Sequence, residues 1–273
     1  MFHGKNVLIT GASRGLGRAF AFELAARGAR PIVLARSGNA LRDVANEIQQ
    51  RHAGTQVEVI VADLAAPDGP HQALQGLQDR GIAIDLLINN AAIGTQGAFL
   101  SRSLTSQLRS VAVNVAGLLA VTHPIAADMA ARGSGGIIFI TSGAAFAPMA
   151  YLASYGATKA FQLYLSEALA EELRGTGVHV MGAHVPDMQT SFGEGSTAPI
   201  AAWAEKPELI AAQTLDDYAR GRAASYPGRA VNRALTWPSR LVPRTTSARL
   251  SASFARKRGL NQVTESDRPT LAG

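Results

Sequence analysis

The stretch Val7-Leu8-Ile9-Thr10-Gly11-Ala12-Ser13-Arg14-Gly15-Leu16-Gly17 decides the expected fold, because it joins an apolar strand to a glycine-rich turn and a helix. Val7–Thr10 has the β-branched and aliphatic composition of a buried strand. Helical spacing runs from about Leu16 to Arg27, and Gly28 ends it. A glycine turn at this place lets a phosphate approach the backbone, where the N–H groups and dipole of the helix N-terminus attract it. This stretch therefore predicts a strand–helix unit that binds a phosphate.

The spacing of the turn is Gly-x-x-x-Gly-x-Gly, through Gly11, Gly15 and Gly17. It differs from the Gly-x-Gly-x-x-Gly of longer dinucleotide folds and lacks the Lys-Ser/Thr of a Walker loop. The turn also fits a hydrolase pattern with Ser13 as nucleophile, but that nucleophile normally follows several strands, and one strand precedes Ser13. A purely structural turn remains the alternative.

Strand and helix patterns alternate to about residue 185. Further strands are expected at Pro31–Ala35, Val57–Ala62, Ile84–Asn89, Gly136–Thr141 and Val178–His184, with helices at Leu41–His52, Gly69–Arg80, Ser103–Ala131 and Ser154–Arg174. This pattern predicts an α/β fold with a single Rossmann-type doubly wound parallel sheet and helices on both faces. Such sheets bind ligands at the carboxyl ends of their strands. We divide the chain into a dinucleotide-binding and catalytic core (1–192), a substrate loop that completes the fold (193–238) and a basic C-terminal tail (239–273).

Composition excludes several classes of protein. The chain has 273 residues, 47% hydrophobic and 17% charged, so it can bury a sizeable core and is too apolar to be disordered. A membrane-spanning helix is not expected, since no apolar run reaches about 18 residues, and without a secretory leader we expect a cytoplasmic protein. Cysteine is absent, which excludes disulfides, thiolate nucleophiles and iron–sulfur clusters. The six histidines lack metal-ligand spacing, so we expect no metal site.

Charge is unevenly distributed along the chain. Residues 1–219 carry a net charge of −3, whereas residues 220–273 carry +9. Within the tail, Ser239–Leu260 places Leu241, Val242, Leu250 and Phe254 among basic residues, as in an amphipathic helix. Such a tail can associate with a membrane surface, cover the site or dock on another subunit, and nucleic acid is a less favoured partner. The alternative is a solvated segment rich in arginine.

The end of the second strand indicates which cofactor the fold takes. An acidic residue about 20 positions past the glycines usually binds the adenine-ribose hydroxyls. Here the strand is followed by Arg36, and the first carboxylate beyond it is Asp43. Arg36 and Arg14 can instead bind a 2′-phosphate, which a carboxylate would repel. We therefore predict NADP (NADPH) rather than NAD, with two solvated arginines as the alternative.

Tyr155 and Lys159 lie four residues apart at the start of a helix and therefore share a face. A lysine ammonium favours the phenolate form of a neighbouring tyrosine, so we expect it to lower the pKa of Tyr155. Such a pair can exchange a proton with a carbonyl or alcohol oxygen. Ser142 follows the fifth strand at the ligand-binding edge of the sheet, where its hydroxyl can hold the substrate oxygen.

Together these motifs resemble those of the short-chain dehydrogenase/reductase family. The matching residues, in the family's order, are Thr10-Gly11, Gly15 and Gly17, then Asp63, Asn89-Asn90-Ala91, Asn114, Ser142, and Tyr155 with Lys159. The resemblance covers about residues 4–192. It implies hydride transfer between a nicotinamide cofactor and a carbonyl or secondary alcohol, with the protein supplying position and the proton.

The resemblance also implies a role for each matching residue. Tyr155 is the general acid or base, Lys159 lowers its pKa and holds the nicotinamide ribose, and Ser142 orients the carbonyl. Asn114 fixes a water that links Lys159 to solvent. Asp63, with Leu64 beside it, binds the adenine, and Asn90 stabilises the sheet centre near the cofactor. The remaining cofactor contacts are expected from Gly11, Ser13, Arg14, Gly15, Leu16, Gly17, Arg36, Pro186 and Thr190, with Ser191 as the alternative to Thr190.

Two positions depart from the family pattern. Ala92 stands where the family usually has the glycine of Asn-Asn-Ala-Gly, which is a small change. Asp187 follows Pro186 where the family usually has a glycine. Glycine there lets the backbone approach the nicotinamide, so Asp187 puts that end of the site in doubt.

The substrate is less clearly encoded than the cofactor. The segment Met188–Glu208 is the substrate loop by resemblance, and apolar residues in and near the site favour a medium-sized apolar ketone or alcohol: Phe146, Met149, Tyr151, Leu152, Phe192, Ile200 and Trp203. The alternative is that they pack the core or an interface.

We also expect a homo-oligomer, a dimer or tetramer, because the helix with Asn114 and the helix from Tyr155 to Leu173 are apolar on more than one face. Two other functions stay open: a catalytically weak, cofactor-binding regulatory protein, and membrane or nucleic-acid association through the tail.

Overall fold

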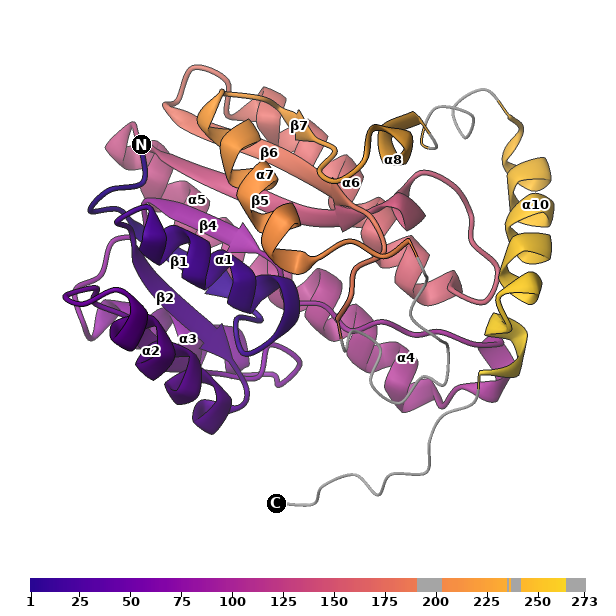
Figure 1. The fold of residues 1–273 in the computed structure, drawn as a ribbon, viewed down its shortest axis with the longest axis horizontal. Helices are drawn as coiled ribbons and strands as arrows, with labels where there is room; N and C mark the ends of the chain where they lie inside the picture. Colours follow the sequence, from indigo (N-terminus) through magenta and orange to yellow (C-terminus); the bar gives the residue numbers. More distant parts are fainter. Residues whose placement is uncertain (191–202, 235, 237–241, 264–273) are drawn as a thin grey trace.

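The computed structural model describes residues 1–190, 203–234, 236 and 242–263 of the chain. The predictions for Ser191, Phe192, Ile200 and Leu241 therefore lie outside the described residues. A seven-stranded sheet in the order β3-β2-β1-β4-β5-β6-β7 forms the centre of the molecule, and every pair of neighbouring strands is parallel (Figure 1). The strands are β1 Asn6–Thr10, β2 Arg30–Ala35, β3 Glu58–Val61, β4 Leu86–Asn89, β5 Gly135–Ser142, β6 Val178–Val185 and β7 Ala224–Ser225.

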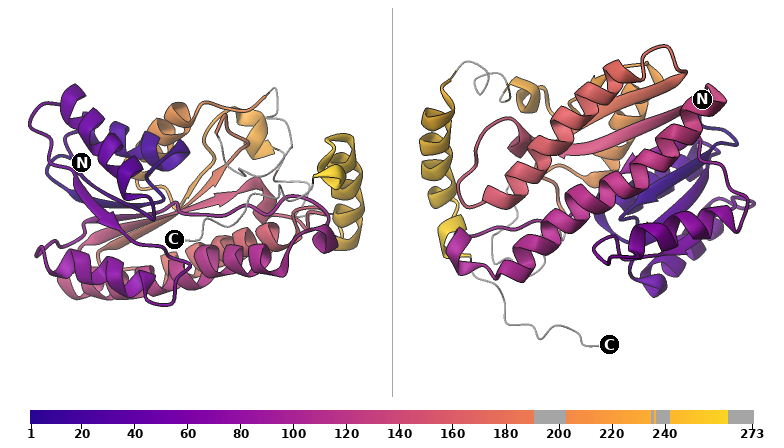
Figure 2. Two further views of the ribbon diagram at one scale, coloured as in Figure 1. Left: turned by 90° about the horizontal axis from the view of Figure 1, so that it is seen from below. Right: turned by 180° about the vertical axis from the view of Figure 1, so that it is seen from behind.

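Helices cover both faces of the sheet, as the alternating pattern predicts. One cluster of buried side chains joins the first face to α1 (Gly15–Ala26), α2 (Gly38–Arg51) and α7 (Pro207–Ala219). A second cluster joins the other face to α3 (Gly69–Gln78), α5 (Leu118–Arg132) and α6 (Ala153–Glu172). Figure 2 shows the sheet edge-on between the two layers. The predicted Rossmann-type fold is confirmed.

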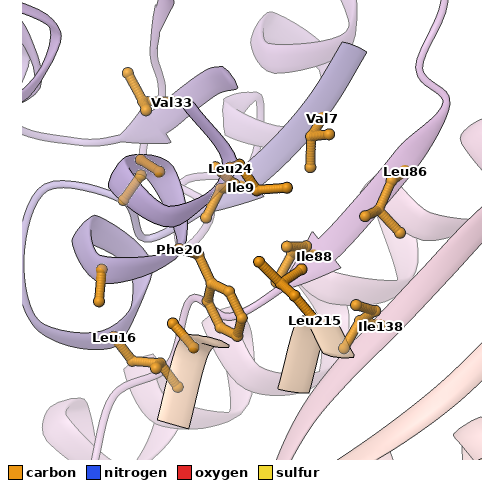
Figure 3. Close-up of a cluster of buried hydrophobic side chains, with 14 of the residues drawn as sticks. Val7, Ile9, Leu16, Phe20, Leu24, Val33, Leu86, Ile88, Ile138 and Leu215 are labelled. Atoms are coloured by element: carbon orange, nitrogen blue, oxygen red, sulfur yellow. The ribbon is translucent and has the colours of Figure 1, made fainter. Parts of the chain in front are cut away.

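Successive side chains of β1 point to opposite faces of the sheet, and both faces are covered, so the strand is apolar at consecutive positions. Val7 and Ile9 point into the first cluster and Leu8 into the second, and all three are fully buried. In the first cluster, Phe20 of α1 and Leu215 of α7 lie near Ile88 of β4 (Figure 3). Burying one such side chain contributes about 1.5–3 kcal/mol, so both layers hold the sheet in place.

The direction in which successive strands are added to the sheet reverses at β1, in the middle of the sheet. β1 pairs with β2 on one side and with β4 on the other, so the chain winds outward in both directions from this point. Ligands bind open α/β sheets in the crevice beyond the carboxyl ends of such strands. The glycine turn follows β1 at this edge, and Ser142 ends β5 at the same edge, because the strands are parallel.

One strand, one helical irregularity and the helix α7 were not predicted. β7 has two residues, Ala224 and Ser225, and pairs with Gly182 and Ala183 of β6. A strand this short has no alternation that a sequence pattern can show. Within the predicted helix at 103–131, α4 (Leu104–Val111) passes into α5 through a π-helical segment, Ala112–Gly117, which carries Asn114.

The helical run Leu104–Arg132 is long and apolar enough, by length and composition alone, to cross a membrane, a test that a core helix packed inside a protein also passes. Its apolar residues include Leu118, Val121, Ile125 and Met129, which lie in the second core cluster. Packing against the sheet accounts for much of its apolar composition.

The C-terminal region returns to the catalytic end of the molecule. It forms α8 (Ala230–Ala234), α10 (Arg244–Lys257) and a short 3₁₀ turn at Leu260–Gln262. Figure 1 shows α10 at the opposite end of the molecule from α2. Ala255, Leu260 and Val263 are buried there against Tyr151 and Leu152, just before α6. Residues 242–263 thus pack on the core.

Candidate active site

The glycine turn requires glycine at positions where the backbone leaves no room for a side chain. Gly11 has φ +70° and Gly15 has φ +55°, values that L side chains rarely adopt. A Cβ on Gly11 would lie 2.8 Å from Ala91 Cα, and one on Gly17 would lie 2.3 Å from the Gly11 carbonyl oxygen. The turn therefore packs directly against the end of β4 and against the start of α1.

Asn90 fastens this turn to the sheet. Its Nδ2 donates to the carbonyl oxygens of Thr10 at 2.9 Å and Gly11 at 3.3 Å. In return, the Thr10 hydroxyl accepts from the backbone N–H groups of Asn90 at 3.0 Å and Ala91 at 2.9 Å. The predicted structural role of Asn90 matches these bonds, because they fix the carboxyl end of β1 to that of β4.

The N-terminus of α1 lies at the turn, because the helix begins at Gly15. Arg14 is the N-cap residue, and its side chain does not cap the helix. Ser13 is half-buried, and Leu16 packs into the core. Thr190 approaches the turn from the far side, since a Cβ on Gly15 would lie 3.4 Å from its Cγ2. A glycine turn without side chains at positions 11, 15 and 17, followed directly by a helix N-terminus, fits a pyrophosphate.

Both arginines that we assign to the adenine ribose are exposed. Arg36 follows the last residue of β2, and Arg14 lies in the glycine turn. Asp63 follows β3 and is held in place: its Oδ2 accepts from Arg109 Nη2 at 2.5 Å and its Oδ1 from the Ala65 N–H at 3.0 Å. Leu64 beside it is buried. Arg109 was missed by the sequence reasoning, because it belongs to α4, 46 positions further along the chain.

Ser142, Tyr155 and Lys159 meet where β5 ends and α6 begins. The hydroxyl groups of Tyr155 and Ser142 are hydrogen-bonded, and Ser142 Oγ also accepts from the Ala144 N–H at 3.2 Å. Lys159 Nζ lies 5.9 Å from the centre of the Tyr155 ring. The three predicted catalytic side chains therefore form one cluster at the ligand-binding edge of the sheet.

The ionisation of Tyr155 differs from the sequence prediction. Burial raises the pKa of Tyr155 above its ordinary value, the hydrogen bond from Ser142 opposes this, and the negative charge of Asp187 adds to it. Lys159 was expected to lower this pKa. The Lys159 ammonium instead donates to other acceptors, and it is not among the groups that shift the pKa of Tyr155. A protonated phenol is the form that a general acid needs.

Lys159 is almost completely buried, at 2% exposed. Its Nζ donates to the Ile140 carbonyl at 2.7 Å and to Gln162 Oε1 at 2.8 Å. Burial lowers the pKa of Lys159 to about 7, because the charged form loses its hydration. Both protein acceptors are neutral, so neither of them offsets the loss of hydration.

Asn114 is fully buried on the π-helical segment and bonded on every side. Its Oδ1 accepts from the Ile93 N–H at 2.8 Å, and its Nδ2 donates to the Ile93 carbonyl and the Thr158 hydroxyl, both at 3.0 Å. Its backbone carbonyl accepts from Gln162 Nε2 at 2.8 Å. The resemblance assigns to Asn114 a water that links Lys159 to solvent; in the structure the Gln162 carboxamide bridges Lys159 Nζ and the Asn114 carbonyl.

Asp187, the residue that replaces the family's glycine, has a partner from the tail. Arg258 Nη1 lies 3.0 Å from Asp187 Oδ2. The same guanidinium lies 5.5 Å from the ring centre of Trp203 and 5.7 Å from that of Phe254. Arg258 thereby joins the end of β6 to the substrate loop and to α10. Pro186, before Asp187, is half-buried.

The apolar residues that we assign to the substrate divide into two groups. Phe146 packs edge-on against His184, with ring centres 4.9 Å apart, and stacks on Tyr226 at 6.3 Å. Tyr151 and Leu152 pack against the C-terminal cluster, which agrees with the alternative of a packing role for these two. Within the described ranges, no group of three metal-ligating side chains occurs.

Comparison with known proteins agrees with this site. A sequence model described as short chain dehydrogenase matches residues 5–199. The ketoacyl reductase HetN of Nostoc sp. is 35% identical over 211 residues, which cover 76% of this chain and 73% of that protein. Other relatives, such as the very-long-chain 3-oxoacyl-CoA reductase of Pyricularia oryzae (32% identical), are longer, and this chain spans about half their length.

Solved structures extend the likeness beyond the matched segment. A short-chain dehydrogenase from Sphingobium yanoikuyae in complex with NADPH is 27% identical, covers 98% of each chain and has a TM-score of 0.77. The 3-ketoacyl-(acyl-carrier-protein) reductase from Brucella melitensis, a complex with NADH, is 26% identical, covers 80% of this chain and 91% of its own, and has a TM-score of 0.69. Nicotinamide cofactors of both kinds thus occur among similar structures. The glycine turn, the Ser142–Tyr155–Lys159 cluster and these likenesses lead to one conclusion: the chain belongs to the short-chain dehydrogenase/reductase family of oxidoreductases.

Proposed function

We propose that this protein interconverts a ketone and a secondary alcohol on a medium-sized apolar substrate, with NADP(H) as its cofactor. The observation that carries the proposal is the hydrogen-bonded pair of Ser142 and Tyr155 hydroxyls beside the buried Lys159 ammonium. These groups lie at the carboxyl edge of the sheet, next to a turn that fits a pyrophosphate. When bound, the nicotinamide supplies or accepts the hydride.

The protein residues position the carbonyl and move the proton. In reduction, the substrate oxygen accepts hydrogen bonds from Ser142 and Tyr155, so its carbon becomes more electrophilic. As negative charge develops on that oxygen, Tyr155 donates its proton, and the Lys159 ammonium stabilises the phenolate that remains. The raised pKa of Tyr155 keeps the phenol protonated before the reaction and so favours its use as the acid.

The preference for NADP(H) rests on Arg36 and Arg14. Arg36 leaves the sheet at the carboxyl end of β2, where the adenine ribose lies in doubly wound folds, and Arg14 lies in the adjoining turn. Both carry positive charge without a carboxylate at the end of the strand. A 2′-phosphate gives these guanidinium groups a charge-assisted partner that the ribose hydroxyl of NAD does not.

The test is a panel of ketones of increasing size, each followed by the loss of NADPH absorbance. Tyr155→Phe is the matched variant, since it removes the hydroxyl alone. Activity of the wild type on apolar ketones, lost in the variant, supports the proposal. A wild type without turnover on any ketone or alcohol, despite tight NADPH binding, favours the regulatory alternative.

A further inference from the structure

Gln162 is a fully buried polar side chain that lies between two of the candidate catalytic residues. It follows Lys159 by almost one turn of α6, and its side chain points toward the π-helical segment that carries Asn114. Its Oε1 accepts from Lys159 Nζ at 2.8 Å, and its Nε2 donates to the Asn114 backbone carbonyl at 2.8 Å. The residue was not singled out by the sequence analysis, and no family motif includes it among the matching positions.

The chemistry of the two partners fixes the orientation of the carboxamide. An ammonium can only donate hydrogen bonds, and a backbone carbonyl can only accept them. Oε1 must therefore face Lys159, and Nε2 must face Asn114. An apolar side chain makes neither bond, and a carboxylate makes the first but repels the carbonyl. Glutamine has the length and the donor–acceptor polarity that this position requires.

We propose that Gln162 is a positioning residue for the reaction: it holds the Lys159 ammonium in register with Tyr155 by tying it to the backbone of Asn114. The role rests on the proposed function of Tyr155 and Lys159. Two of the three ammonium hydrogens are taken by Ile140 and Gln162, which leaves one for the reacting side. Because an amide neither gains nor loses protons near neutral pH, Gln162 orients and stabilises the charge without relaying a proton.

Loss of Gln162 has a predictable electrostatic result. Lys159 is buried among neutral acceptors, one of which is the Ile140 carbonyl of β5. Tyr155, on the same helix as Lys159, is a titratable group that faces it. The π-helical segment places the uncharged side chain of Asn114 nearby. Asp187 acts on Tyr155. Removal of one acceptor destabilises the ammonium relative to the neutral amine. We expect Gln162→Met, which keeps length without polarity, to lower the pKa of Lys159 by about one unit.

Direct titration of Lys159 tests this without cofactor or substrate. The chain has four lysines, Lys5, Lys159, Lys206 and Lys257, so NMR of protein labelled at the lysine side chains can resolve each, with Lys159→Arg to assign the signal. Gln162→Glu should raise the Lys159 pKa above that of wild type, because it adds a negative charge. The opposite signs in the Met and Glu variants cannot come from general disruption of the fold.

Gln107 offers a matched control. It is also a buried glutamine, and its carboxamide bonds to the Phe99 carbonyl at 3.1 Å and to the Ser154 hydroxyl instead of to Lys159. Gln107→Met should leave the titration of Lys159 where it is. An equal shift of the Lys159 pKa in the Gln107→Met and Gln162→Met variants would overturn the proposal. A Gln162→Met protein that unfolds cooperatively on heating but keeps the wild-type pKa of Lys159 would overturn it as well.

Kinetics give the second readout. If the Lys159 pKa falls from about 7 to about 6, the charged fraction at pH 7 drops from about half to about a tenth, so kcat should fall about fivefold. The loss should shrink at pH 6, where the ammonium reforms, with KM little changed. A loss of kcat that is constant across pH would overturn the positioning role. A wild type without any carbonyl turnover overturns the proposed function, whereas an unchanged Lys159 titration overturns the role of Gln162 alone.

Discussion

Arg36→Asp should abolish or reverse the preference that we expect between the two nicotinamide cofactors. Arg36 is exposed just beyond the carboxyl end of β2, and Arg14 is exposed in the glycine turn. NADPH differs from NADH by a single 2′-phosphate. The substitution replaces a group that attracts this phosphate with one that repels it and that can accept hydrogen bonds from ribose hydroxyls.

The magnitude follows from the exposure of the two arginines. A hydrogen bond to a charged group contributes about 1.5–3 kcal/mol, and solvent at an exposed site reduces the contribution toward the lower limit. A difference of about 1.4 kcal/mol is a factor of about ten in Kd. We therefore expect wild type to bind NADPH about tenfold more tightly than NADH. We expect Arg36→Asp to bind NADPH at least tenfold more weakly, with equal or improved affinity for NADH.

Titration of each protein with each cofactor, followed by nicotinamide fluorescence, measures the four constants. Arg30→Asp is the control, because Arg30 is exposed at the amino end of the same strand and the charge change is identical. With a rise of about 3.3 Å per residue, the two arginines lie about 20 Å apart, roughly twice the screening length in about 0.1 M salt. Equal wild-type affinities for the two cofactors, or the same loss in Arg30→Asp, would refute the assignment of NADP.

Three further predictions concern catalysis, ionisation and assembly. Tyr155→Phe should retain cofactor affinity in fluorescence titration but lose about 10²–10⁴ in kcat, and a variant with more than about a tenth of wild-type turnover would contradict the acid role of Tyr155. Asp187→Asn removes a charge that raises the pKa of Tyr155, so the phenol should ionise at lower pH when phenolate absorbance is followed in a pH titration, with Tyr155→Phe to identify its signal; ionisation at higher pH would contradict this sign. Leu104 and Leu108 are 70% and 58% exposed on α4, and we expect them to face a second copy of the chain; Leu108→Arg should lower the mass measured by light scattering, and a monomeric wild type at micromolar concentration would contradict the interface.

Six strands of the sheet and the helices that cover it, apart from α7, could be predicted because each of these elements carries its own pattern. Residues such as Leu8 and Ile9 are apolar on consecutive positions because both faces of the strand are buried, and this is visible in a few residues. β7 could not be predicted, since its two residues form a strand only by pairing with β6. The π-helical segment at Ala112–Gly117 was missed for a related reason, because its residues fit an ordinary α-helix equally well.

In the candidate site, too, features set by neighbouring residues could be predicted, and features set by distant elements could not. Gly11 and Gly17 could be assigned from the sequence because the turn that needs them is local. The ionisation of Tyr155 and Lys159 could not, because burial by surrounding elements dominates both pKa values. Gln162 was overlooked because its acceptor and donor partners become apparent only when α6 packs against the segment with Asn114.

Asp187 stands where the family usually has a glycine, and its partner in the fold could not be predicted from the sequence. From the sequence, Asp187 could crowd the backbone at the nicotinamide or place a charge beside the substrate; in the fold its charge disfavours the phenolate of Tyr155. The structure places Arg258 3.0 Å from that carboxylate, although 71 positions separate the two residues. Because Arg258 also contacts the rings of Trp203 and Phe254, the pairing depends on the packing of α10 against the core. The basic tail and the unusual acidic residue, two separate anomalies in the sequence, are therefore parts of one interaction in the folded protein.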